Sequence, residues 1–134
     1  MGLAERRGIT EYKDKVFPGV KAKIDTAAGF PVEFDVRWDT LEDPYAASNA
    51  EKVMGATYFT PLQTALQSIG QDDMGKSALK SALKKVIIDG SAGTSYDSFT
   101  FEGGVLTLQH KPGVNEDYVD ERTKGLQALL ESKL

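Results

Sequence analysis

Two adjacent glycines, Gly103 and Gly104, constrain the fold of this chain more than any other feature of its sequence. They separate two segments, 96–102 and 105–111, in which apolar and polar residues alternate. A two-residue turn between antiparallel strands needs positive φ angles, which glycine adopts without strain, so the sequence predicts a β-hairpin here. The predicted pairs are Glu102 with Val105, Phe101 with Leu106, Thr100 with Thr107, and Phe99 with Leu108.

Periodicity and end signals predict elements before the hairpin. A four-residue apolar repeat indicates a helix over 10–28, which Pro18 should bend or divide. Strict alternation over 32–38 indicates a strand with one buried face. Asp43-Pro44 and Thr60-Pro61 each combine an N-cap residue with proline at the first helical position. They predict helices over about 44–58 and 61–69.

The rest of the chain is predicted in the same way. A helix is expected over 73–83, and the β-branched run 86–88 is typical of a central strand. Asn115, followed by two acidic residues, predicts the N-cap of a last helix. Val114 and Val119 are spaced as a hydrophobic staple across that cap.

This order of elements predicts one α+β domain over residues 1–134, of which 1–9 are expected to be flexible. The expected sheet is mixed and four-stranded, with one parallel crossover and a C-terminal antiparallel meander. Helices should pack mainly on one face of this sheet.

Composition narrows the classes of function. The formal net charge of −4 and the absence of a basic cluster argue against nucleic-acid binding. A chain with no cysteine and one histidine is poorly supplied for zinc or iron, and neither a metal nor a cofactor is expected. No apolar stretch is long enough for a membrane span, and the charged N-terminal residues do not resemble a signal peptide, so a cytoplasmic location is expected.

The hairpin register places Asp97 opposite His110 at the end of the apolar face. A carboxylate bonded to an imidazole orients the ring and raises its basicity, as general-base catalysis requires, and Ser95 is the nearest candidate nucleophile. A cross-strand pair that only fixes the register is the stronger interpretation, because no nucleophile has a position that the sequence defines.

The segment 89–95 follows the predicted central strand and contains the candidate ligand-binding residues Gly90, Ser91, Gly93 and Thr94. Successive backbone amides in such a loop can form an anion-binding nest. Phosphate-binding loops usually run from a strand into a helix, whereas a strand follows here. A plain connection is therefore the favoured interpretation.

If the helices cover one face of the sheet, the other face is polar. The residues expected on that polar face are Glu33, Asp35, Arg37, Ser98, Thr100, Thr107 and Gln109. All of them except Ser98 form the predicted protein-binding surface. The leading hypothesis is a non-catalytic protein-binding or accessory module, as a monomer or homodimer, with an unidentified protein partner. The alternative is a small hydrolase or small-molecule-binding protein with a site near Asp97, His110 and the loop 89–95.

Overall fold

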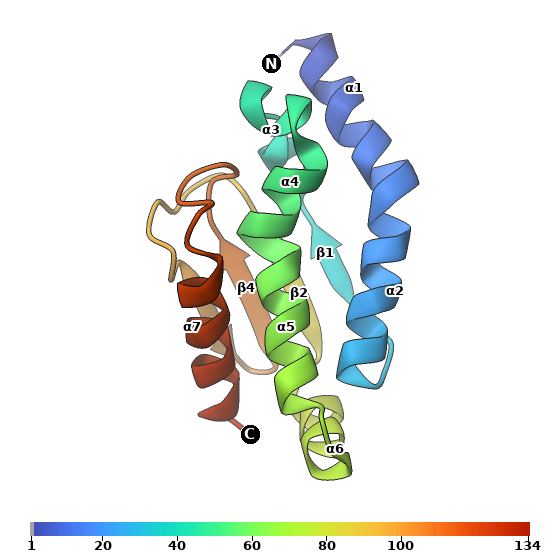
Figure 1. The fold of residues 1–134 in the computed structure, drawn as a ribbon, viewed down its shortest axis with the longest axis vertical. Helices are drawn as coiled ribbons and strands as arrows, with labels where there is room; N and C mark the ends of the chain where they lie inside the picture. The colour runs from blue at the N-terminus through green and yellow to red at the C-terminus, as the bar shows by residue number, and fades with distance from the viewer. Residues whose placement is uncertain (1) are drawn as a thin grey trace.

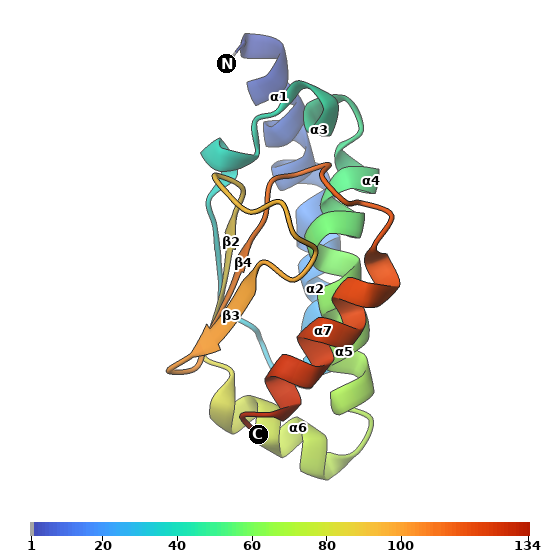
Figure 2. The same cartoon turned by 90° about the vertical axis from the view of Figure 1, so that its left-hand side faces the viewer.

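The computed structural model describes residues 2–134 and shows helices packed against one face of a four-stranded mixed sheet (Figure 1). The strands are β1 (Phe34–Val36), β2 (Lys85–Asp89), β3 (Phe99–Glu102) and β4 (Val105–Gln109). Seen from the side, the sheet forms one layer and the helices form the other (Figure 2). The predicted α+β class and the single-face helical cover are confirmed.

The strand order is β1-β2-β4-β3, and β1, β2 and β4 are mutually parallel. The hairpin has the predicted register in all four pairs, from Glu102 with Val105 to Phe99 with Leu108. The expected meander is limited to this hairpin, because β4 and not β3 lies beside β2. The long connection over residues 90–98 allows β3 to pass to the outer edge, which leaves the central position to the more buried β4.

The N-terminal helical segment consists of α1 (Leu3–Glu11), the π-helical turn η1 (Tyr12–Val16) and α2 (Phe17–Ala28). Residues 3–9, which we expected to be flexible, form the first turns of this segment. The chain accommodates Pro18 by widening the preceding turn. In η1 the amide of Phe17 donates to the carbonyl of Tyr12, five residues back, so the helix continues through a proline that has no amide hydrogen.

A second helical segment follows the short 3-10 turn η2 (Trp38–Leu41). Trp38, which was predicted to be the last residue of the strand, belongs to this turn instead. It consists of α3 (Pro44–Ser48), α4 (Ala50–Met54), the π-helical turn η3 (Gly55–Phe59) and α5 (Thr60–Ile69). The predicted cap is present, since the Asp43 carboxylate accepts the Ala46 amide at 3.0 Å. The predicted boundary at Thr60-Pro61 is wrong, because η3 carries the helix through Pro61 and the chain breaks at Asn49 instead.

The remaining helices are α6 (Asp73–Ala82), close to its predicted range, and α7 (Val119–Glu131). The prediction that Asn115 caps α7 is wrong. Asn115 has φ 55° and lies in a turn, and Tyr118 precedes the first helical residue. The Asn115 carbonyl accepts the Tyr118 amide at 3.1 Å, so this segment is held as a turn before α7 begins.

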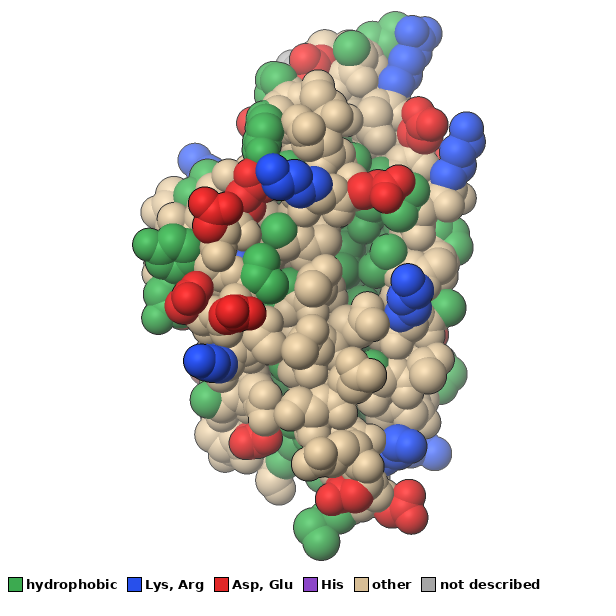
Figure 3. All heavy atoms as spheres, viewed as in Figure 1, with side chains coloured by type: hydrophobic (Ala, Val, Ile, Leu, Met, Phe, Trp, Pro, Cys, Tyr) green, Lys and Arg blue, Asp and Glu red, His purple; other side chains and the backbone are tan. Residues whose placement is uncertain are grey.

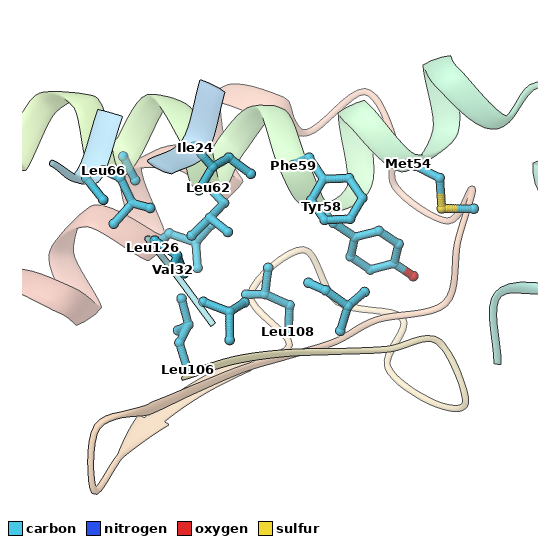
Figure 4. Packing of buried hydrophobic residues seen from close by; sticks show 14 of the residues in the cluster. Ile24, Val32, Met54, Tyr58, Phe59, Leu62, Leu66, Leu106, Leu108 and Leu126 are labelled. Carbon is cyan, nitrogen blue, oxygen red and sulfur yellow. The ribbon is translucent and has the colours of Figure 1, made fainter. Parts of the chain in front are cut away.

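The core lies between the helical layer and the sheet. In the close view, Ile24, Leu62 and Leu126 from three helices face Leu106 and Leu108 of β4 (Figure 4). All these side chains are fully or almost fully buried. An aromatic group closes the core beside β1, where Phe17 lies edge-on to Phe34 with ring centroids 5.6 Å apart. None of the helices between residues 2 and 134 has the length and apolar character needed to cross a bilayer.

Candidate functional site

The carboxyl ends of three parallel strands meet at one edge of the sheet, the usual place for a ligand site in such sheets. Asp89, at the end of β2, is 6% exposed. It accepts the Ser91 amide at 2.9 Å and pairs with the Arg37 guanidinium at 3.2 Å. Burial alone would raise the pKa of Asp89, but bonds from Ser91 and the charge of Arg37 hold it below the ordinary value.

The loop 89–95 uses its backbone for internal contacts. The Gly90 amide donates to the Thr40 hydroxyl at 2.8 Å, and the Lys111 amide donates to the Gly93 carbonyl at 2.9 Å. Gly93 has φ 98°, and a Cβ there would collide with the Gln109 carbonyl, so this glycine is required by the packing of the loop against β4. The amides of Gly90 and Ser91 are therefore already bonded within the protein, which weakens the case for an anion nest.

No hydrogen bond or ion pair within residues 2–134 joins the predicted neighbours Asp97 and His110. Asp97 is exposed and accepts the hydroxyl of Ser95. The carbonyl of Asp97 accepts the Phe99 amide at 2.8 Å, so the chain turns away from the ladder just before β3. His110 is 3% exposed, and its Nδ1 lies 2.7 Å from the Lys111 carbonyl. The two residues predicted as a catalytic pair therefore lie in different environments.

His110 instead belongs to a buried polar cluster, together with Tyr58 and Arg122. The Tyr58 hydroxyl donates to the backbone carbonyl of His110, and in the close view it points away from the neighbouring leucines (Figure 4). Burial raises the pKa of Tyr58, so the phenol remains a hydrogen-bond donor at neutral pH. The pKa of His110 is lowered, mainly by burial and further by the charge of Arg122. The hydrogen bond with the Lys111 carbonyl opposes this shift and only partly offsets it.

Arg122 is a buried, hydrogen-bonded cation that the sequence analysis did not single out. It is 2% exposed, and its Nη1 donates to the Ala56 carbonyl at 2.9 Å while Nη2 donates to the Asn115 carbonyl at 3.0 Å. A signal was present, because Arg122 is spaced three residues after Val119 and four before Leu126, on the predicted core-facing stripe of α7. A cation at such a position indicates a buried polar contact.

Three consecutive residues of η3 connect the second helical segment to the part of the chain that follows β4. The Ala56 carbonyl accepts from Arg122, the Thr57 hydroxyl accepts the Gly113 amide at 3.5 Å, and the Tyr58 hydroxyl donates to His110. The amide of Thr60 donates to Gly55 five residues back, and the next amide in this register would be that of Pro61. Since proline has no amide hydrogen, the Ala56 carbonyl lacks a helical donor, and Arg122 supplies one. This cluster has a clear structural role.

The uncovered face of the sheet has the predicted residues. Adjacent strands place Asp35, Ile87 and Thr107 in one row, with Thr100 beyond them on β3. These side chains alternate with Val86 and Ile88, which are fully buried under the helices. The predicted surface residues are therefore brought to one face, which also carries Lys85, Ile87, Glu102 and Val105. We call it the open face: Glu33, Asp35, Arg37, Lys85, Ile87, Ser98, Thr100, Glu102, Val105, Thr107 and Gln109.

Charges at the end of the open face are paired with one another. Arg37 contacts Asp89 at 3.2 Å and Asp35 at 3.7 Å, and the Gln109 amide donates to Asp89 at 3.4 Å. Within residues 2–134, no group of three or more acidic or histidine side chains is arranged to hold a metal ion. The geometry offers a polar surface, with a hollow lined by Ser98, Thr100, Thr107 and Gln109 among others, and a buried structural cluster. No family model matches this chain, and no match was found among the curated proteins or the solved structures.

Proposed function

We propose that this domain is a protein-binding module that docks through the open face of its sheet. The observation that carries the proposal is the one-sided architecture, in which α2, α5 and α7 lie on the same side of the sheet (Figure 2). The opposite side presents Ile87 at its centre, half-buried, between Asp35 and Thr107. A surface with an apolar centre and hydroxyls beside it has the composition of a docking face.

The pairing of charges supports this use of the face. Arg37 is already neutralised by Asp35 and Asp89, so a partner that covers it meets a paired charge and avoids most of the cost of burying an isolated one. The neighbouring threonines, Thr100 and Thr107, carry no charge. The partner that fits is a protein with a weakly charged surface and an apolar side chain to cover Ile87.

The test identifies the partner and then measures its affinity. A photo-crosslinking amino acid at Thr107 should capture one protein in cells of the source organism, whereas the same probe at Thr64, exposed on α5, should not. With the purified partner, Thr107→Lys should weaken binding about tenfold or more, because the interface would bury an unpaired ammonium.

Thr64→Lys is the matched control, since it makes the same substitution on the helical layer and should leave the affinity unchanged. Both variants should melt at nearly the same temperature as the natural protein. Equal weakening by the two substitutions, or no weakening by Thr107→Lys, would show that the partner does not use the open face.

A further inference from the structure

A groove separates the segment before β3 from the helix α7, on a different side of the molecule from the centre of the open face. It has a volume of about 530 Å³ and is lined by Tyr96, Asp97, Phe99, Glu121, Lys124, Gly125 and Leu129. Gly125 shapes the groove, because a Cβ there would lie 2.8 Å from the Phe99 ring. The absence of a side chain lets Phe99 lie directly against α7.

Tyr96 of this groove lies against a second tyrosine, Tyr118. The rings of Tyr96 and Tyr118 have centroids 5.6 Å apart and are tilted by 38°. Tyr118 is 46% exposed and Tyr96 is half-buried. A partly exposed aromatic pair can offer a ring face to a ligand.

Four carboxylates lie within three residues of these tyrosines in the sequence: Asp97, Asp117, Asp120 and Glu121. Asp97 and Glu121 also line the groove. All four are exposed, and none of the ion pairs within residues 2–134 includes them or Lys124. Arg122 is adjacent in sequence, but its guanidinium points inward to the carbonyls of Ala56 and Asn115. Figure 3 shows acidic side chains grouped beside a hydrophobic surface over the start of α7.

Most of the net charge of the protein is concentrated here. The four carboxylates and Lys124 sum to −3, while the other fifteen basic and sixteen acidic residues sum to −1, of a total of −4. We call this surface the acidic-aromatic patch: Tyr96, Asp97, Asp117, Tyr118, Asp120 and Glu121. Its charge selects a cationic ligand, and its tyrosines favour one that can lie on an aromatic ring.

We propose that the acidic-aromatic patch binds an arginine side chain in an extended segment of a partner protein. A guanidinium stacks on a tyrosine ring and donates paired hydrogen bonds to a carboxylate, which an ammonium cannot do with the same geometry. The apolar part of the groove, Phe99 and Leu129, then receives the aliphatic stem or a neighbouring apolar residue. This surface and its ligand are independent of the open face and its partner.

The test uses the whole chain and a short synthetic peptide of alternating glycine and arginine, with binding measured by calorimetry. We expect binding that is stronger than that of the matching glycine–lysine peptide. Tyr118→Leu and the isosteric double variant Asp120→Asn with Glu121→Gln should each weaken it about threefold to tenfold. Amide chemical shifts of Tyr96 and Tyr118 should move, and those of Asp35 and Ile87, at the centre of the open face, should not.

The control is Glu11→Gln with Asp14→Asn, which removes two exposed charges from α1 and η1, away from the patch. It should leave the affinity for the arginine peptide nearly unchanged. Absence of binding, equal weakening by the control pair, equal affinity for the lysine peptide, or indifference to Tyr118→Leu would each overturn the proposal. The isosteric pair keeps the test decisive if Tyr118→Leu alters the fold.

Discussion

Two helical segments of this protein contain the same irregularity, a π-helical turn just before a proline, in opposite environments. Pro18 follows η1 and is exposed, whereas Pro61 follows η3 and is buried. The turns lie close together, since the Tyr12 and Phe59 rings stack with centroids 6.4 Å apart. Each proline removes one amide donor, so each turn leaves one backbone carbonyl without a helical partner.

The difference lies in how that carbonyl is satisfied. In η1 the Phe17 amide donates to Tyr12, so the unpaired carbonyl is that of Lys13, an exposed residue that water can reach. In η3 the corresponding carbonyl is that of Ala56, and it accepts from Arg122 at 2.9 Å. At the surface, water can therefore satisfy the carbonyl that the proline leaves without a donor. In the interior, a side chain distant in sequence, that of Arg122, must do so.

The largest expected effect comes from removing that arginine. Arg122→Leu leaves the Ala56 carbonyl without a donor and the Asn115 carbonyl with the Tyr118 amide alone, and should lower the free energy of unfolding by about 2–4 kcal/mol. Urea denaturation measures this change. Lys124→Leu is the control, because it alters an exposed cation on the same helix and should change stability by less than about 0.5 kcal/mol. Similar losses in both variants would contradict the special role of Arg122.

A smaller effect is expected from protonation of His110, which would place a second positive charge in the cluster around Arg122. His110 is buried near Arg122, and burial is the main cause that lowers its pKa. Below about pH 6.5 the unfolded chain binds a proton at this histidine that the folded protein binds less readily, so stability falls as the pH decreases through this range. The contribution of one proton cannot exceed about 1.4 kcal/mol per pH unit.

Urea denaturation between about pH 7.5 and 5.5 measures this loss of stability. His110→Gln should remove part of the pH dependence, while the acidic residues contribute equally in both proteins. If the free energy of unfolding depends on pH equally in the natural protein and the variant, His110 is not held neutral by its surroundings.

The smallest effect compares the two prolines directly. Pro61→Ala restores an amide beside the Ala56 carbonyl, so in that background the loss caused by Arg122→Leu should shrink by about 1 kcal/mol. Pro18→Ala should leave the loss caused by Arg122→Leu unchanged and should itself alter stability by less than about 1 kcal/mol. A double-mutant cycle measures both couplings, and equal couplings would show that burial is not what distinguishes the two turns.

Local signals allowed the hairpin to be predicted to the residue. Gly103 and Gly104 fix the turn, and the alternation on either side has only one register that buries Phe99 and Phe101 together. The strand order could not be predicted in this way. No short-range signal distinguishes a β3 that pairs with β2 from one that passes to the edge, since both leave the hairpin intact.

The sequence also indicated which residues share the open face, because the two-residue period of a strand assigns each side chain to a face. The same period also predicted Asp97 opposite His110. The structure does not bring these two residues together, because the chain turns at Asp97 before the ladder begins. The π-helical turns were missed as well. A proline in a helical pattern predicts an interruption, and whether the helix ends or widens depends on donors from elsewhere, such as Arg122.

The position of β4 between β2 and β3 affects how the sheet is completed during synthesis. The residues of β2 emerge from the ribosome before those of β4, yet one whole side of β2 pairs only with β4. Until the hairpin has emerged and docked, Val86 and Ile88 belong to a strand with an unpaired edge, which is a template for aggregation. Nascent chains arrested just before Val105 should therefore be recognised by chaperones more strongly than chains released after the final helix.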